Sequence, residues 1–210
     1  MLTTQKSFNI SNSHNLASED IIRTLNCKKF EKGNIFPDNF NNLWLLKKGI
    51  VKTLTYSERG KTIILGYWGE GDVVGLPLSK VEPYEIHCLN DVEAIKINEE
   101  QYSCLSNKIL CCIRQTDELL RIVRIEKMYS RLVKVLIWLA HKFGLQTLHG
   151  IIINIRLTHQ DIADIIGSTR VTVTRLLNQL DREELIFRPR RFSIIVKDVN
   201  LLQKQLKLEE

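Results

Sequence analysis

Residues 157–186 read LTHQDIADIIGSTRVTVTRLLNQLDREELI, and the pattern of this stretch indicates how the C-terminal half of the chain folds. Apolar residues recur every three or four positions on both sides of Gly167, which is typical of two amphipathic helices. The glycine ends the first helix, because it tolerates the left-handed conformation that follows a helix. Thr158, with Asp161 three residues later, is suited to cap the start of that helix. The stretch therefore predicts a helix–turn–helix over about residues 158–180.

The predicted second helix is apolar on one face and cationic at its leading end. Ser168 or Thr169 caps it. Its inward face is formed by Val173, Leu176, Leu177 and Leu180. The leading end of such a helix fits the major groove of DNA, where an arginine bonds both acceptors of guanine and a valine contacts a thymine methyl group. The predicted base contacts are Arg170, Val171, Thr174 and Arg175.

A basic hairpin follows this helix. Residues 185–196 read LIFRPRRFSIIV, in which three arginines lie at a turn between two phenylalanines. Next to a helix pair this is typical of a wing that rests on the DNA backbone, although such a segment alone is also typical of a solvated loop. Hydroxyl groups, side-chain amides and the amides at helix starts also bind phosphates. The predicted backbone contacts are Thr158, His159, Gln160, Ser168, Thr169, Thr172, Arg188, Arg190 and Arg191.

The N-terminal half has a different pattern. Between about residues 30 and 97, short β-branched runs alternate with Gly, Asn and Asp, which predicts an antiparallel barrel or roll. No Pro or Gly occurs over residues 84–143. Within this stretch a heptad seam predicts a long helix that forms a homodimer, and the alternative is a monomeric helix buried in one core. The seam consists of Ile109, Ile113, Thr116, Leu120 and Val123.

These patterns predict an α+β fold with an N-terminal antiparallel β-roll, a long dimerisation helix and a C-terminal winged helix–turn–helix. The expected divisions are a flexible tail (1–18), a sensor roll (19–105), the dimerisation helix (106–128) and a DNA-binding domain (129–210). A second amphipathic helix, SRLVKVLIWLAHKFG, and a short strand in HGIIINIRL connect the dimerisation helix to the helix–turn–helix.

Composition restricts the function further. The 210 residues have a formal net charge of +6, which favours a polyanionic partner, although a basic surface without a partner has the same composition. The five cysteines show no metal-ligand spacing, which indicates reduced thiols in a cytosol-like compartment. No apolar run is long enough to span a bilayer, and there is no nucleophile motif or phosphate-binding loop. Neither a membrane protein nor an enzyme is therefore predicted.

The succession of roll, long helix and winged helix–turn–helix resembles the CRP/FNR family of transcription regulators. Two motifs, GSTRVTVTRLL over residues 167–177 and MYSRLV over 128–133, are especially similar to the cyanobacterial branch of global nitrogen regulators. The resemblance implies a homodimer that binds double-stranded promoter DNA, contacts RNA polymerase and reads a palindrome with GTA and TAC ends. It also implies that Arg170 and Arg175 meet base edges.

The same resemblance bears on the effector. The residue pairs that clamp cyclic AMP in the family are absent. One arginine of the family's 2-oxoglutarate clamp is replaced by Glu82, and the other falls near Cys112. Three possibilities stay open, namely 2-oxoglutarate, another effector or none, whereas haem, iron–sulfur and metal sites are not supported. The residues expected to line the effector pocket are Val74, Gly75, Leu76, Arg114 and Asp117.

We thus expect a dimeric DNA-binding regulator, an activator of nitrogen-related genes. The alternatives are a family member with another regulon and a signalling module whose helix pair serves only for packing. The abundance of Ile, Asn and Lys suggests an AT-rich genome, which favours a plastid-encoded protein of the chloroplast stroma over one of a bacterial cytoplasm.

Overall fold

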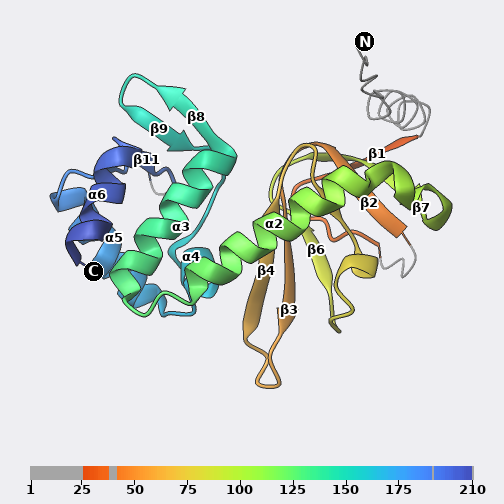
Figure 1. Ribbon diagram of the computed structural model, residues 1–210, viewed down its shortest axis with the longest axis horizontal. Helices are drawn as coiled ribbons and strands as arrows, with labels where there is room; N and C mark the ends of the chain where they lie inside the picture. Colours follow the sequence, from red (N-terminus) through yellow and green to blue (C-terminus); the bar gives the residue numbers. More distant parts are fainter. Residues whose placement is uncertain (1–25, 38–41, 191, 210) are drawn as a thin grey trace, which may run out of the picture.

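The computed structural model describes residues 26–37, 42–190 and 192–209. An N-terminal β-roll and a C-terminal helical lobe lie on either side of the chain's midpoint, and the long helix α2 (Ser106–Val123) runs across the roll towards the C-terminal lobe (Figure 1). The predicted tail at residues 1–18 and the predicted backbone contact Arg191 lie outside the described residues.

The roll consists of two antiparallel sheets, with the strand orders β1-β7-β2-β5 and β4-β3-β6. The strands are β1 (Cys27–Phe30), β2 (Asn42–Lys48), β3 (Val51–Tyr56), β4 (Thr62–Trp68), β5 (Val73–Val74), β6 (Glu85–Cys88) and β7 (Val92–Asn98). Trp44 and Ile97 from one sheet pack with Val51 and Ile86 from the other in a single core. The predicted antiparallel roll is therefore confirmed.

The long helix ends earlier than the sequence predicts. A turn separates α2 from α3 (Met128–Phe143), whereas the prediction extended one helix over residues 106–128. Arg131 stabilises this turn, because its guanidinium donates to the carbonyl oxygen of Ile125 (2.9 and 2.6 Å) and to that of Ile166 (2.7 Å). A turn held by a side chain of the following helix leaves no signature in apolar periodicity.

The C-terminal lobe packs four helices around a small antiparallel sheet with the order β10-β11-β9-β8. Its elements after α3 are β8 (Gly144–Thr147), β9 (Gly150–Ile153), α4 (His159–Ile166), α5 (Arg170–Arg182), β10 (Ile186–Phe187), β11 (Ile195–Val196) and α6 (Val199–Glu209). The strand predicted in HGIIINIRL is one arm of the β8–β9 hairpin, and β8 and α6 were not predicted. Tyr67 of β4 reaches into the core formed by Leu136, Ile162 and Leu177.

Two sets of polar contacts fix this lobe against the roll. Lys52 Nζ on β3 lies 2.9 Å from Asp161 Oδ1 on α4. Asp72, which precedes β5, pairs with Lys142 Nζ of α3 at 2.9 Å and accepts a hydrogen bond from Gln115 Nε2 of α2 at 2.8 Å. The C-terminal lobe is thus attached to the roll through α4 and through α3, and α2 contributes to the second contact.

Candidate DNA-binding site

The first helix of the helix–turn–helix begins with the predicted capping box. Thr158 Oγ1 accepts from the backbone N–H of Asp161 (3.0 Å), and Asp161 Oδ2 accepts from the backbone N–H of Thr158 (2.9 Å). Gly167 ends the helix at φ 66° and ψ 41°, where glycine has no steric penalty. Of the two expected caps of α5, Thr169 is used, because its hydroxyl accepts from the backbone N–H of Thr172 (3.2 Å). These caps fix the direction in which α5 leaves the turn.

The second helix presents its leading end to solvent. Its buried face consists of Val173, Leu176, Leu177 and Leu180. On the opposite face Arg170, Val171 and Arg175 are exposed, and Val171 retains 79% of its accessible surface. An apolar side chain this exposed between two cations is suited to contact a thymine methyl group. Three of the four predicted base contacts are therefore accessible.

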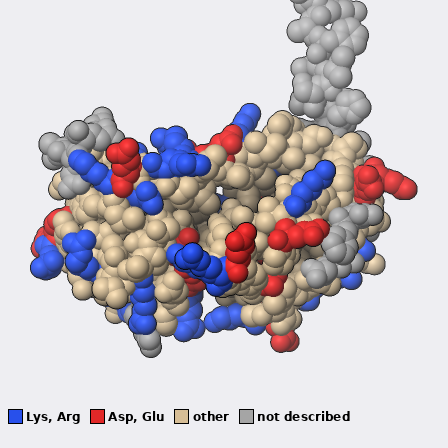
Figure 2. Space-filling view, turned by 90° about the horizontal axis from the view of Figure 1, so that it is seen from below, with Lys and Arg blue, Asp and Glu red and all other residues tan. Residues whose placement is uncertain are grey.

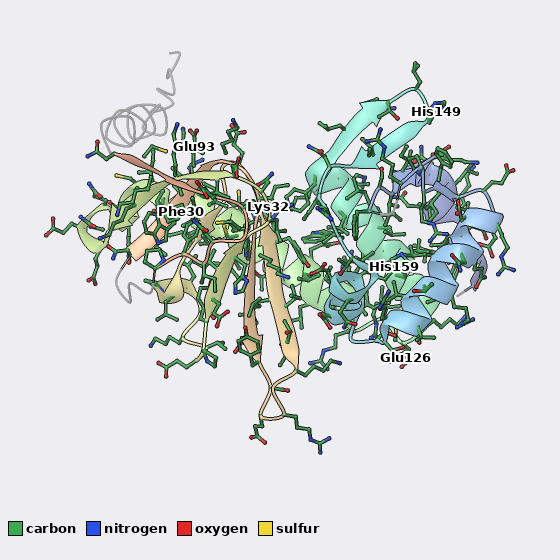
Figure 3. The ribbon with its side chains drawn as sticks, turned by 180° about the vertical axis from the view of Figure 1, so that it is seen from behind. Phe30, Lys32, Glu93, Glu126, His149 and His159 are labelled. Atoms are coloured by element: carbon green, nitrogen blue, oxygen red, sulfur yellow. The ribbon has the colours of Figure 1, made fainter. Side chains whose placement is uncertain are left out.

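The fourth predicted base contact, Thr174, lies against the protein. Its hydroxyl donates to the carbonyl oxygen of Arg170 (2.8 Å) and lies 2.8 Å from His159 Nδ1. His159 lies at the start of α4, on the C-terminal lobe (Figure 3). Burial lowers the pKa of His159, and the positive charges of Arg188 and Arg170 lower it further. The ring is therefore neutral at pH 7 and acts as a packing partner of α5.

A groove of about 1020 Å³ follows the exposed face of α5. Its lining residues are Arg170, Val171, Thr174, Arg175, Asn178, Asp181, Arg182 and Arg188. Asn178, Asp181 and Arg182 were not predicted. The signal for Asn178 and Arg182 was their spacing, because they follow Arg175 by three and seven residues on one helical face.

Arg188, a predicted backbone contact, is paired within the protein. Its side chain turns back towards α5, where Nε and Nη2 donate to Asp181 Oδ2 (3.2 and 3.0 Å) and Nη2 donates to Asn178 Oδ1 (2.7 Å). Only 20% of the Arg188 side chain is exposed. A guanidinium paired with a carboxylate adds little net charge for a phosphate. By contrast, Arg190 is exposed in the wing.

The other predicted backbone contacts surround the start of α4. Thr158, His159 and Gln160 line a second hollow of about 410 Å³ together with Arg170 and Phe192. The Gln160 amide donates to Asp164 Oδ1 (2.8 Å), while Ser168 and Thr172 are half-buried.

The basic excess of the chain is concentrated in this lobe. Residues 129–210 contain 13 Lys and Arg against 8 Asp and Glu, a net charge of +5 out of +6. Figure 2 shows Lys and Arg side chains spread over the C-terminal lobe with fewer acidic side chains among them. Such a distribution attracts the phosphates of DNA to the lobe that bears the helix–turn–helix.

Only part of the predicted dimer seam on α2 is exposed. Ile113 and Leu120 are 52% and 53% exposed, and Thr116 is exposed between them. Ile109 packs against the roll and Val123 against the core of the C-terminal lobe. The exposed apolar face is completed by Leu110, 49% exposed, which was not predicted.

The residues predicted for the effector pocket are not brought together within one chain. Val74 and Gly75 are buried and Leu76 is half-buried beside them. Cys112 of α2 closes over this strand, with its Sγ 3.4 Å from both the backbone nitrogen and the carbonyl oxygen of Val73. Arg114 and Asp117 are exposed, and the helical repeat puts them on the side of α2 turned away from Cys112.

Sequence comparisons place these features among known proteins. The model of the Crp-like helix-turn-helix domain matches residues 130–205. Regulatory protein CysR of Synechococcus elongatus is 37% identical over 162 residues, which cover 76% of this chain and 78% of that protein. The Global nitrogen regulator of the same organism is 32% identical over 203 residues, which cover 86% of this chain and 90% of that protein. The ycf28 protein of Porphyra purpurea is 27% identical over 133 residues, which cover 58% of this chain and 56% of that protein.

A CRP-family transcriptional regulator of Thermus thermophilus has the same fold, with a TM-score of 0.74 and 20% identity over 86% of this chain and 96% of that one. The β-roll, the helix–turn–helix and the sequence relatives together identify a DNA-binding transcription regulator. The chain belongs to the CRP family and is related to the global nitrogen regulators of cyanobacteria. Because these relatives are regulators, the prediction that the protein is not an enzyme is confirmed. Within the described part of the chain, no helix has the length and apolarity needed to cross a membrane.

Proposed function

We propose that the protein binds palindromic promoter DNA as a homodimer, with one copy of α5 in each of two successive major grooves. The observation that supports this most directly is the exposure of Arg170, Val171 and Arg175 along one groove. The twofold axis would run beside α2, where Ile113 and Leu120 expose apolar surface that a second copy would cover. The two recognition helices would then lie roughly 34 Å apart, one turn of B-DNA.

The proposed target is a GTA-N8-TAC palindrome upstream of nitrogen-related genes, which the protein activates through contact with RNA polymerase. The 32% identity to a Global nitrogen regulator supports this assignment. A different regulon is the second candidate, because identity to Regulatory protein CysR is 37%. Genome-wide occupancy of the protein under nitrogen limitation would distinguish the two, since sites upstream of genes unrelated to nitrogen would refute the first.

The effector and the compartment are also proposals. We infer that 2-oxoglutarate, if it binds, requires the dimer, because Arg114 and Asp117 face away from Val74 and Gly75 of their own chain. Calorimetry with 2-oxoglutarate in the presence and absence of operator DNA tests whether 2-oxoglutarate binds. Absence of heat in both titrations would leave another effector or none. The chloroplast stroma is the proposed location, with similarity to ycf28 of Porphyra purpurea as its support.

DNA binding itself is tested by gel retardation with the palindrome and a scrambled duplex over a range of salt concentrations. Arg170→Ala should weaken binding to the palindrome by roughly 1–3 kcal/mol and relax the preference for it over the scrambled duplex. Arg190→Ala should weaken both duplexes about equally and flatten the salt dependence. Equal behaviour of the two variants would refute the division into base and backbone contacts.

A further inference from the structure

The groove along α5 contains a side chain whose orientation is set by the neighbouring wing segment. Asn178 is exposed on α5 and lines the groove together with Arg170, Val171 and Arg175. Its Oδ1 accepts a hydrogen bond from Arg188 Nη2 at 2.7 Å. The carboxamide plane is therefore fixed with its oxygen towards the protein.

The residue that fixes it is itself held in place. Arg188 donates twice to Asp181 Oδ2, from Nε (3.2 Å) and Nη2 (3.0 Å), and its side chain is only 20% exposed. The planar guanidinium has a rigid arrangement of donors, so it bonds Asp181 and Asn178 simultaneously in a way that an ammonium does not reproduce. Asp181, Arg188 and Asn178 form one connected unit across α5 and the segment after β10.

The spacing along α5 places Asn178 at a neighbouring base pair. It follows Arg175 by three positions, a rise of about 4.5 Å along the helix axis, which compares with about 3.4 Å for one base-pair step. Val171, Arg175, Asn178 and Arg182 follow a spacing of four, three and four residues, so they face the same side of the helix. Asn178 thus continues the row of side chains that begins with the predicted base contacts.

Resting on the proposed mode of DNA binding, we propose that Asn178 is a further base-reading residue and that Arg188 is its positioning residue. With Oδ1 engaged by Arg188, the Asn178 amide offers its two N–H donors to the groove. It then selects bases that present a major-groove acceptor, namely guanine, adenine or thymine, and disfavours cytosine, which presents a donor. The usual two-bond pairing of asparagine with adenine also needs the oxygen, so preference for adenine over the other acceptors is weak.

The test is selection of duplexes from a palindromic library by the full-length protein, followed by affinity measurement on duplexes that differ at single base pairs. Wild type should disfavour cytosine about three- to tenfold at one base pair per half-site, the effect of one hydrogen bond. Asn178→Ala should abolish this preference and leave the other positions unchanged. Arg188→Ala and Asp181→Ala should abolish it too, and Arg188→Lys should restore part of it.

Arg190→Ala is the matched control, because Arg190 is an exposed arginine of the same wing. It should lower affinity for all duplexes equally and leave every base preference intact. If Arg188→Ala behaves in the same way, Arg188 is a phosphate contact and the proposal is refuted. Circular dichroism establishes that each variant is folded, and Asn178→Ala tests the base contact even if Arg188→Ala does not fold.

The outcomes separate this inference from the proposed function. Enrichment of a palindrome by wild type, with an identical base profile for Asn178→Ala, would refute the role of Asn178 and retain the proposed function. Absence of any enriched sequence with the wild-type protein would refute both.

Discussion

The ion pair between Lys52 and Asp161 should account for a measurable part of the attachment of the helix–turn–helix to the roll. The two side chains are each 19% exposed, and Lys52 Nζ lies 2.9 Å from Asp161 Oδ1. At this distance the attraction between unit charges is about 6 kcal/mol for an effective dielectric constant of 20. Desolvation and side-chain ordering oppose it, so we expect a net coupling of about 1–2 kcal/mol.

A double-mutant cycle measures this coupling. Asp161→Asn keeps an acceptor for the backbone N–H of Thr158 but leaves Lys52 unpaired, and it should lower the free energy of unfolding by about 2–3 kcal/mol. Lys52→Met should cost about 1 kcal/mol, because Asp161 retains its bonds to Thr158. Urea unfolding followed by circular dichroism gives both values and that of the double variant. If the two changes are additive within about 0.3 kcal/mol, the pair does not couple the lobes and our reasoning is wrong.

The pH dependence of the stability difference between wild type and Asp161→Asn is an internal control. Burial alone would raise the pKa of Asp161, but hydrogen bonds from Thr158 and the ammonium of Lys52 outweigh burial and lower it. The unfolded state therefore binds a proton more readily than the native state as the pH falls. The advantage of wild type over Asp161→Asn should be fully present above about pH 4 and decline as the pH falls through the lowered native pKa.

Leu120→Glu should convert the proposed dimer to a monomer in sedimentation and abolish operator binding, whereas the same change at Leu201, which is 50% exposed on α6, should leave the proposed dimer intact. A dimeric Leu120→Glu variant would mean that the seam is misplaced. Burial, and then the charges of Arg188 and Arg170, lower the pKa of His159. Wild type should therefore lose stability relative to His159→Gln as the pH falls below about 6.5. Melting temperatures of the two proteins that change in parallel with pH would contradict this. Gly167→Ala should cost about 1–2 kcal/mol in urea unfolding, because φ is 66° and the nearest atom to an added Cβ is 3.8 Å away; an unchanged midpoint would show that the turn rearranges.

The elements defined by local periodicity could be predicted from the sequence. The capping box at Thr158, the glycine stop at Gly167 and the inward leucines of α5 each depend on residues within one or two helical turns. The exposure of Arg170 and Arg175 follows from the same repeat. The antiparallel roll was indicated by turn residues at short intervals, although neither its strand order nor its division into two sheets followed from them.

The features that the sequence did not reveal depend on residues distant in the chain. The turn after α2 is held by Arg131, whose partner Ile166 is 35 residues away. The ion pair between Lys52 and Asp161 joins residues that are 109 apart. The position of Arg188 in a basic wing predicts a contact with the DNA backbone. Its partners Asp181 and Asn178 lie close in sequence, but only the folded hairpin brings them within hydrogen-bonding distance.

The groove along α5 and the ion pairs between the lobes use almost separate sets of residues. The ion pairs between the roll and the C-terminal lobe involve α4 through Asp161 and α3 through Lys142, whereas the groove proposed to face DNA is lined by α5 and the segment after β10. Asp161 also caps α4 through its two bonds to Thr158, and Thr158 itself lines the hollow beside Arg170. The Lys52–Asp161 ion pair therefore joins β3 to the first turn of α4, beside the hollow that Arg170 lines. Substitutions along the groove should change base preference without changing the coupling of the lobes. Substitutions of Lys52 should change the coupling of the lobes without changing base preference.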